Sequence, residues 1–249
     1  MGTNSDLSHK GSVIRYDTDI LEPMEPRLFD VDWVQKNHHH RGSSPGRNQA
    51  HFVTYGGHDM VLRHFRRGGL VGKLNRDLYL GVRNAKTRAM REFELLGWMH
   101  NHGLPVPRPI AALVAHRGVF YRAAILTERI PGARPFQEIL AEGMVPSGTW
   151  NTVGAVIRCM HDHHVFHSDL NCRNILIDTA HQAWLIDFDK CARRKPGPWK
   201  AQNLDRLKRS LHKQNRAGAN VTWTDEDWSE LMRGYADADK EFDGTQAHP

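Results

Sequence analysis

The spacing of polar side chains between residues 167 and 189 limits the possible folds of this 249-residue chain more than any other feature of its sequence. Two short apolar runs lie beside polar loops, and packing alone would not place acidic or amide residues next to buried strands. In chain order the segment contains His167, Asp169, Asn174, the apolar residues 175–177, the apolar residues 184–186 and Asp187. This order predicts two strands, joined by a turn, that bring the polar residues of two loops together.

These polar residues fit the needs of phosphoryl transfer. That reaction requires a carboxylate near the attacking hydroxyl and oxygen ligands for the Mg²⁺ that bridges the nucleotide phosphates. We therefore expect Asp169 to accept or orient the hydroxyl proton, Asn174 and Asp187 to be metal ligands, and His167 to brace the loop. Each residue taken alone also fits a turn that caps a strand, but the spacing of the whole set favours catalysis.

The remaining hydrophobic pattern divides the chain into a β-rich part followed by a helical part. Few apolar clusters occur at the start, so residues 1–40 are expected to form a loop-rich extension. An N-terminal lobe over residues 41–130 and a C-terminal lobe over residues 131–249 follow. Within them we expect hairpins at 50–55 with 60–65 and 111–115 with 119–127, and helices at 85–102, around Val153–Met160, around Leu204–Leu211 and after a capping box at Thr224–Asp227.

This order of elements, together with the loops around Asp169 and Asp187, resembles the protein-kinase-like fold over roughly residues 46–211. The resemblance implies an α+β protein of two lobes, with a β-rich N-terminal lobe and a mainly α-helical C-terminal lobe. It also implies that ATP and Mg²⁺ are the cofactors.

The N-terminal part departs from the family pattern at two places. Where the family has a glycine-rich phosphate loop, this chain has only Gly46, and where the family has a strand lysine it has Arg63. An arginine can grip phosphate through a bidentate fork. Glu92 is the expected helix partner of this cation, with Glu94 as its competitor. The backbone of Glu128–Ile130 is expected to contact the base of ATP.

The sequence carries 34 Lys and Arg against 28 Asp and Glu, a formal charge of +6, which favours an anionic partner. Residues 61–91 contain nine basic residues and one acid, and residues 190–216 contain ten basic residues and one acid. Such clusters can hold a protein at an anionic membrane, although a solvated basic surface explains them equally well. Nucleic acid is not expected as a partner, because no aromatic residues are interleaved with the basic ones to stack on bases.

Residues 61–73 and 184–191 closely resemble bacterial 3-deoxy-D-manno-octulosonic acid (Kdo) kinases, of the lipopolysaccharide kinase family. The resemblance implies ATP-dependent phosphorylation of the 4-hydroxyl of Kdo on a lipid A precursor, at the cytoplasmic face of a Gram-negative inner membrane. Arg66, Arg67 and residues 193–195 are candidate docking groups for the carboxylate and phosphates of that lipid. Membrane contact is expected to be peripheral, since no amphipathic anchor helix stands out, and no protein partner is evident.

Two other functions stay open at the level of sequence. The chain could phosphorylate another acceptor, such as a different sugar of the lipopolysaccharide core, a small molecule or a protein. It could also be a non-catalytic binding module, since the glycine-rich loop and the strand lysine are missing. The joint presence of Asp169, Asn174 and Asp187 argues against such a module, because binding alone has no chemical need for all three.

Cysteine content and the N-terminal residues bear on the compartment. Cys159, Cys172 and Cys191 are an odd set without a Cys-x-x-Cys pair, which predicts free thiols and a reducing compartment. Residues 1–10 are polar, and no window contains the roughly 18–20 apolar residues that a membrane-spanning helix needs. The chain is therefore expected to be neither exported by a leader at its start nor integral to a membrane.

Overall fold

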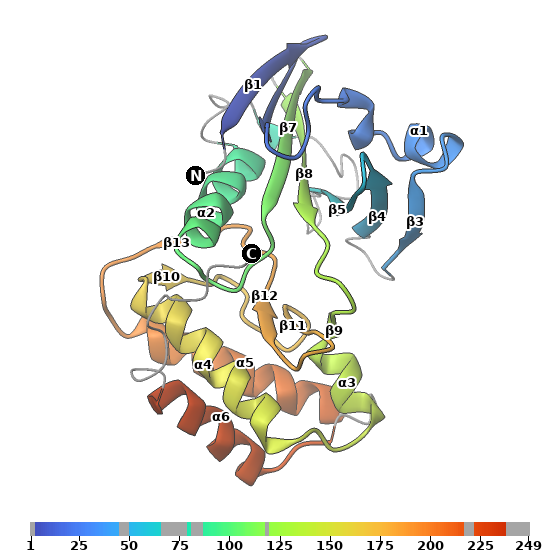
Figure 1. Cartoon of the computed structure of the whole chain (residues 1–249). Helices are drawn as coiled ribbons and strands as arrows, with labels where there is room; N and C mark the ends of the chain where they lie inside the picture. Colours follow the sequence, from blue (N-terminus) through green and yellow to red (C-terminus); the bar gives the residue numbers. More distant parts are fainter. Residues whose placement is uncertain are drawn as a thin grey trace. The chain divides into compact units, whose positions relative to one another are not determined.

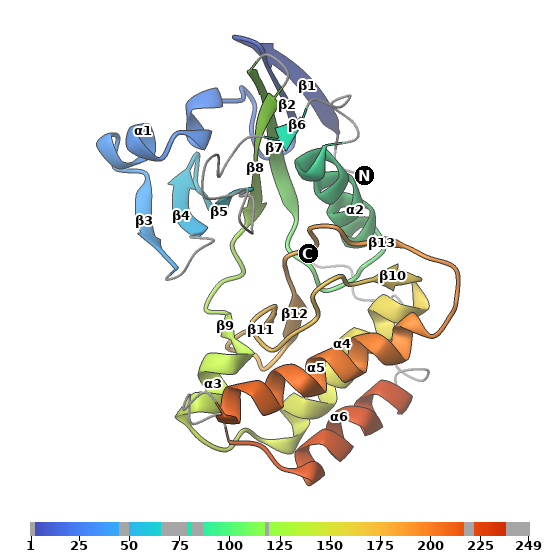
Figure 2. The same cartoon turned by 180° about the vertical axis from the view of Figure 1, so that it is seen from behind.

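The computed structural model describes residues 3–44, 50–65, 79–80, 87–117, 120–216 and 222–237 (Figures 1 and 2). The chain folds into two compact units. The first contains residues 1–98 and 107–129, and the second contains residues 99–106 and 130–249. A sheet dominates the first unit and helices dominate the second, which confirms the predicted α+β class with its β-rich N-terminal part.

Within the described ranges, the first unit is organised around an eight-stranded antiparallel sheet. Its strands follow the order β1-β2-β7-β8-β5-β4-β3, and β6 pairs with β8. The strands are β1 Asn4–His9, β2 Ser12–Asp17, β3 His40–Ser43, β4 Ala50–Tyr55, β5 His58–His64, β6 Tyr79–Leu80, β7 Pro109–Arg117 and β8 Phe120–Glu128. The two predicted hairpins are present as β4–β5 and β7–β8. Alternate residues of the central strands, such as Met60 and Leu62 of β5, form the core.

The prediction of a loop-rich extension over residues 1–40 is wrong for its first part. β1 and β2 form a hairpin around Lys10 and Gly11, whose φ angles of 46° and 75° permit a tight two-residue turn. β2 also pairs with β7, so this hairpin extends the sheet. The hydrophobic pattern does not reveal it because β1 is an edge strand with mostly exposed side chains, held by backbone hydrogen bonds.

Helical segments border the sheet of the first unit. A 3-10 turn, η1 (Pro26–Phe29), leads into α1 (Val31–Lys36), and Asp30 caps α1 by accepting hydrogen bonds from two of its backbone amides. α2 (Arg88–Asn101) falls within the helix predicted from the sequence. Figures 1 and 2 show α1 beside β3 and α2 beside the part of the sheet that contains β2 and β7.

The second unit combines a group of helices with short strands. Its elements are α3 Phe136–Glu142, α4 Ser147–Asp162, α5 Trp199–Arg216, α6 Asp225–Asp237, β9 Arg134–Pro135, β10 Val165–Phe166, β11 Ile175–Ile177, β12 Ala183–Leu185 and β13 Ala192–Arg193. β12, β11 and β9 pair in that order, and β10 pairs with β13. The predicted capping box precedes α6, where Thr224 and Asp227 each accept a hydrogen bond from the other's backbone amide.

The backbones of α4 and α6 lie in close contact. A Cβ added to Gly154 would lie 1.9 Å from the carbonyl oxygen of Leu231, and a Cβ added to Gly234 would lie 2.0 Å from the carbonyl oxygen of Asn151. Any side chain at either position would push the helices apart, so both positions require glycine. This contact also fixes the position of Tyr235, the residue after Gly234.

The three cysteines of the chain lie in its interior. Cys159, Cys172 and Cys191 are buried and form no disulfide, and burial raises the pKa of the Cys159 thiol to about 11. Of the helices in the described residues, none is long and apolar enough to cross a membrane.

Candidate active site

The loop after β10 is organised around the buried imidazole of His167. Its Nε2 lies 3.0 Å from the carbonyl oxygen of Ile186, to which it donates, and its Nδ1 accepts from the Asp169 amide at 3.2 Å. One ring nitrogen donates and the other accepts, so the ring is neutral, and burial lowers its pKa. A neutral, buried ring in this position braces the Asp169 loop against the residue before Asp187.

Two asparagine side chains close the Asp169 loop. Nδ2 of Asn171 and Nδ2 of Asn174 each donate to the carbonyl oxygen of Asp169 at 2.9 Å. The carbonyl oxygen of Asn174 accepts from the Ile186 amide at 3.0 Å. The side-chain nitrogen of Asn174 is thus committed to the loop, and its Oδ1 is the atom that could meet a cation.

Asp187 begins a tight turn after β12. Its φ of 63° lies in the left-handed region, which is costly for a residue with a side chain and is typical of functional turns. Phe188 is buried, with its ring centroid 4.9 Å from that of His167. Ser168 Oγ donates to the carbonyl oxygen of Asp189 at 2.7 Å. These contacts interlock the turn at Asp187 with the loop that carries Asp169.

A chain of polar side chains from α4, α5 and α6 holds the same loop, and the sequence pattern did not predict it. Asn203 of α5 accepts from the His167 amide at 3.2 Å and donates to the His167 carbonyl oxygen at 2.8 Å. His161 continues the chain, with Nε2 3.3 Å from Asn203 Oδ1 and Nδ1 2.8 Å from the Tyr235 hydroxyl. The sequence contains one signal for this clamp, because Asn203 interrupts the buried stripe of α5 that includes Leu207.

The buried His161 predicts a loss of stability in acid. Burial lowers its pKa from 6.5 to about 4, so between these values the unfolded chain binds a proton that the folded protein does not. We expect the free energy of unfolding to fall by about 3 kcal/mol from this residue as the pH is lowered through that range. Urea unfolding at several pH values measures the fall. The variant His161→Gln should show a shallower pH dependence, and equal slopes in both proteins would contradict the assignment.

The Asp169 carboxylate is exposed and paired with a cation from α5. Arg206 Nη1 lies 3.1 Å from Asp169 Oδ1. Nothing in the sequence distinguishes Arg206 from the other basic residues between 190 and 216. Its position three residues after Asn203 explains the pairing, because the turn of α5 that clamps the loop backbone also presents this guanidinium to Asp169.

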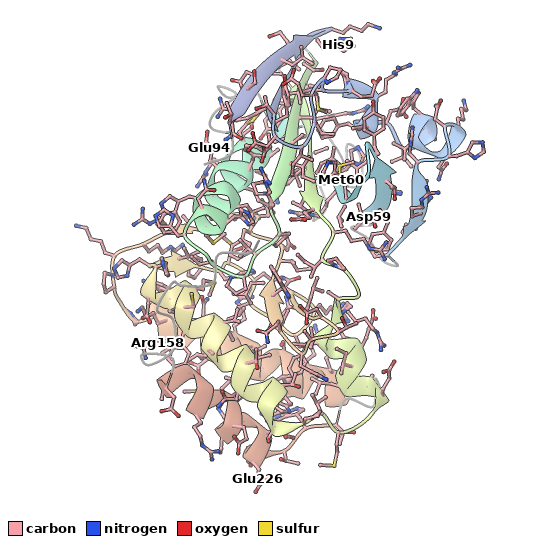
Figure 3. All side chains as sticks on the ribbon, viewed as in Figure 1. His9, Asp59, Met60, Glu94, Arg158 and Glu226 are labelled. Atoms are coloured by element: carbon pink, nitrogen blue, oxygen red, sulfur yellow. The ribbon has the colours of Figure 1, made fainter. Side chains whose placement is uncertain are left out.

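In the first unit, the predicted strand cation and helix acid pair with each other. Arg63 of β5 donates through Nη2 to Oε1 of Glu92 on α2. Glu92 is buried, and the guanidinium carbon of Arg63 lies 5.0 Å from the centroid of the Phe65 ring. Glu94, labelled in Figure 3, is half exposed and pairs instead with Arg15 of β2 at 2.7 Å. Glu92 rather than Glu94 is therefore the partner of Arg63.

The predicted hinge segment has most of its backbone donors engaged. The Glu128 amide donates to the Arg108 carbonyl oxygen at 2.8 Å, and the Arg129 amide donates to the Asp59 carbonyl oxygen at 2.9 Å. Glu128 can therefore meet an adenine base through its carbonyl oxygen but not through its amide. Ile130 is the first residue of the second unit after this segment.

The structure describes some of the predicted binding residues but not others. Gly46, Arg66 and Arg67 lie outside the described residues. Residues 193–195 are exposed, and the guanidinium carbon of Arg194 lies 3.5 Å from the centroid of the Phe166 ring. This contact holds one cation of the run at the surface of the second unit.

The loops of the second unit present oxygen donors suited to Mg²⁺. Asp187 offers a carboxylate and Asn174 offers Oδ1, and hard oxygen ligands of this kind are those that Mg²⁺ prefers. Three or more His, Cys, Asp or Glu side chains that could hold a metal together do not occur among the residues that the structure describes. A cation held by Asn174 and Asp187 would need further oxygens, which nucleotide phosphates supply.

Residues 31–235 match the sequence model of the Lipopolysaccharide kinase (Kdo/WaaP) family. The chain belongs to this family. A Vibrio parahaemolyticus protein named 3-deoxy-D-manno-octulosonic acid kinase is 42% identical over 219 residues, which cover 88% of this chain and 92% of the relative. A protein of the same name from Photobacterium profundum is 40% identical, and the match covers 89% of this chain and 94% of the relative. Another from Haemophilus influenzae is 41% identical, and the match covers 84% of this chain and 89% of the relative.

Membership of the lipopolysaccharide kinase family makes the chain a phosphotransferase with a kinase-like fold. Kinases take their phosphoryl group from ATP. The non-catalytic alternative is therefore not favoured for this kinase.

Proposed function

We propose that this kinase transfers the γ-phosphoryl group of ATP to the 4-hydroxyl of Kdo on a lipid A precursor, in lipopolysaccharide core biosynthesis. The observation that carries the proposal is the interlocked pair of loops bearing Asp169 and Asp187. They occur in a chain that is about 40% identical, over most of its length, to relatives named for Kdo phosphorylation.

Asp169 is the proposed general base. It accepts the proton of the acceptor hydroxyl as the hydroxyl oxygen bonds to the γ-phosphorus. The bond from that phosphorus to the oxygen bridging the β-phosphate breaks, and ADP leaves. Asn174 and Asp187 would hold Mg²⁺, which when bound neutralises charge on the nucleotide phosphates. His167 keeps the two loops aligned through its bond to the Ile186 carbonyl.

The proposed contact of this kinase with the phosphates of ATP is Arg63, which Glu92 orients. Replacing Arg63 with alanine is expected to raise the KM for ATP about tenfold or more, because a charge-assisted hydrogen bond contributes about 1.5–3 kcal/mol. Arg63→Lys should raise the KM for ATP by a smaller factor, since lysine keeps the positive charge but lacks the bidentate guanidinium. Initial rates against ATP at saturating acceptor measure the effect.

Arg15→Ala is the matched control, because Arg15 also pairs with a glutamate of α2, Glu94. This variant should leave the KM for ATP unchanged. Thermal unfolding of both variants separates binding from stability. An equal rise in KM for the two variants at equal stability would contradict the role of Arg63.

The transfer itself is tested with purified protein, ATP, Mg²⁺ and a Kdo-bearing lipid A precursor, with mass spectrometry of the lipid. A gain of one phosphate that needs both ATP and the acceptor is the expected result. Binding of ATP without modification of the lipid would shift the acceptor to another core sugar, a small molecule or a protein. Failure to bind ATP would overturn the proposed role of Arg63 and the hinge segment.

The proposed place of action is the cytoplasmic face of the inner membrane, held by peripheral contact. The exposed basic residues 193–195 favour anionic lipid headgroups. Sedimentation with anionic vesicles at low salt should retain the kinase, and high salt should release it, because salt screens exposed charges. Equal binding to zwitterionic vesicles would contradict an electrostatic contact. Neither nucleic acid nor a protein partner is part of the proposal.

A further inference from the structure

The pair between Arg206 and Asp169 contributes little to holding the fold. The side chains are 48% and 60% exposed, and an ion pair between exposed side chains typically contributes at most about 1 kcal/mol. Asp169 is nevertheless the proposed base, so a guanidinium beside it lies next to the place where the acceptor hydroxyl must bind. Binding of the acceptor is therefore a better explanation for this cation than stability.

Arg206 is held by a rigid part of the second unit. Asn203, one turn earlier on α5, is buried and clamps both the amide and the carbonyl of His167. Leu207, the residue after Arg206, is fully buried. The backbone that carries the guanidinium is thus fixed relative to the Asp169 loop, and a binding group on a fixed element loses little freedom when a ligand arrives.

The guanidinium of Arg206 has capacity for a second anion. The contact between the two side chains joins Nη1 of Arg206 to Oδ1 of Asp169. A guanidinium carries five N–H donors, so this contact uses a small part of its capacity. The other arginine of this loop, Arg173, is directed elsewhere, because its Nε donates to Gln137, which in turn donates to Gln214 at 3.0 Å. Arg206 is therefore the cation best placed to meet an anion bound beside Asp169.

We propose that Arg206 determines acceptor specificity by binding the carboxylate of the acceptor sugar while Asp169 engages the hydroxyl. This inference rests on the proposed function. In Kdo, two ring carbons separate the carbon that bears the 4-hydroxyl from the carboxylate carbon, so both groups can be reached from one loop. Arg206 then selects sugar acids over neutral sugars, because a guanidinium recognises a carboxylate by charge and by paired hydrogen bonds.

The test compares two acceptors, the Kdo-bearing lipid A precursor and the same lipid with its Kdo carboxylate converted to a neutral carboxamide. In Arg206→Gln, kcat/KM for the carboxylate acceptor should fall about tenfold to a hundredfold, the range expected when a charged hydrogen bond is lost. The same variant should change kcat/KM for the carboxamide acceptor less than about threefold. Arg206→Lys should recover part of the loss.

Arg233→Gln is the matched control, because Arg233 is an exposed arginine of α6 that pairs with Glu230. It removes the same charge and should not alter the ratio between the acceptors. An equal loss on both acceptors in Arg206→Gln would overturn the recognition of the carboxylate and leave the proposed function standing. A wild-type protein that phosphorylates neither acceptor would overturn the proposed function and this inference together.

Discussion

Asp169→Asn is expected to lower kcat by about a hundredfold to ten-thousandfold, the usual contribution of a general base. Asparagine has nearly the same shape as aspartate but cannot accept the hydroxyl proton. The fold should not change, because the carboxylate is exposed and the loop is held through the Asp169 amide and carbonyl, which the substitution keeps. Steady-state release of ADP in the presence of acceptor measures the loss.

Asp205→Asn is the control for this experiment. Asp205 is an exposed acid of α5, next to the arginine that pairs with Asp169. The substitution therefore removes one negative charge near the site and leaves the proposed base, Asp169, unchanged. Full turnover by Asp169→Asn would overturn the proposed mechanism, whereas similar losses in both variants would assign the effect to local charge.

Gly234→Ala is expected to cause a large loss of stability in the second unit, because it adds a methyl group between two closely packed helices. The new Cβ would lie 2.0 Å from the carbonyl oxygen of Asn151, and the obstacle is helix backbone that cannot rotate away. Overpacking of this kind costs up to about 3 kcal/mol and occasionally more, which corresponds to a fall in Tm of roughly 10 °C for a chain of this size. Gly154→Ala should behave in the same way, because its Cβ would meet the Leu231 carbonyl.

Gly148→Ala provides the matched control, because Gly148 lies on α4, the helix that also carries Gly154. A Cβ at Gly148 would meet nothing within 4 Å, so alanine should be neutral or stabilise the helix by up to about 1 kcal/mol. Thermal unfolding of the three variants gives the comparison. Equal Tm values for Gly148→Ala and Gly234→Ala would show that α4 and α6 do not pack at the distance described.

The loop of Asp169 and the turn of Asp187 could be predicted because their contacts are local. Strands Ile175–Ile177 and Ala183–Leu185 lie close in the sequence and pair with each other. The Ile186 amide then donates to the Asn174 carbonyl oxygen, which ties the start of the Asp187 turn to Asn174. Short-range pairing of this kind leaves a readable pattern of apolar runs and turns.

The sheet edge and the clamp on the loop could not be predicted in the same way. β1 has few buried side chains, so its order depends on backbone hydrogen bonds, which the hydrophobic pattern does not record. Asn203 and Arg206 reach the Asp169 loop across 36 and 37 residues of sequence. Such contacts depend on where α5 packs, and the sequence of α5 alone states only that one face is apolar.

The sequence by itself determined the class of fold and the residues of the loop that the proposed chemistry needs. Both could be read from hydrophobic periodicity and residue spacing, which reflect contacts between residues close in the sequence. Only the tertiary structure decided which of two nearby acids pairs with Arg63. Glu92 and Glu94 stand two residues apart on α2, so they point to different sides of the helix. The packing of α2 against the sheet turns Glu92 toward β5 and leaves Glu94 to Arg15.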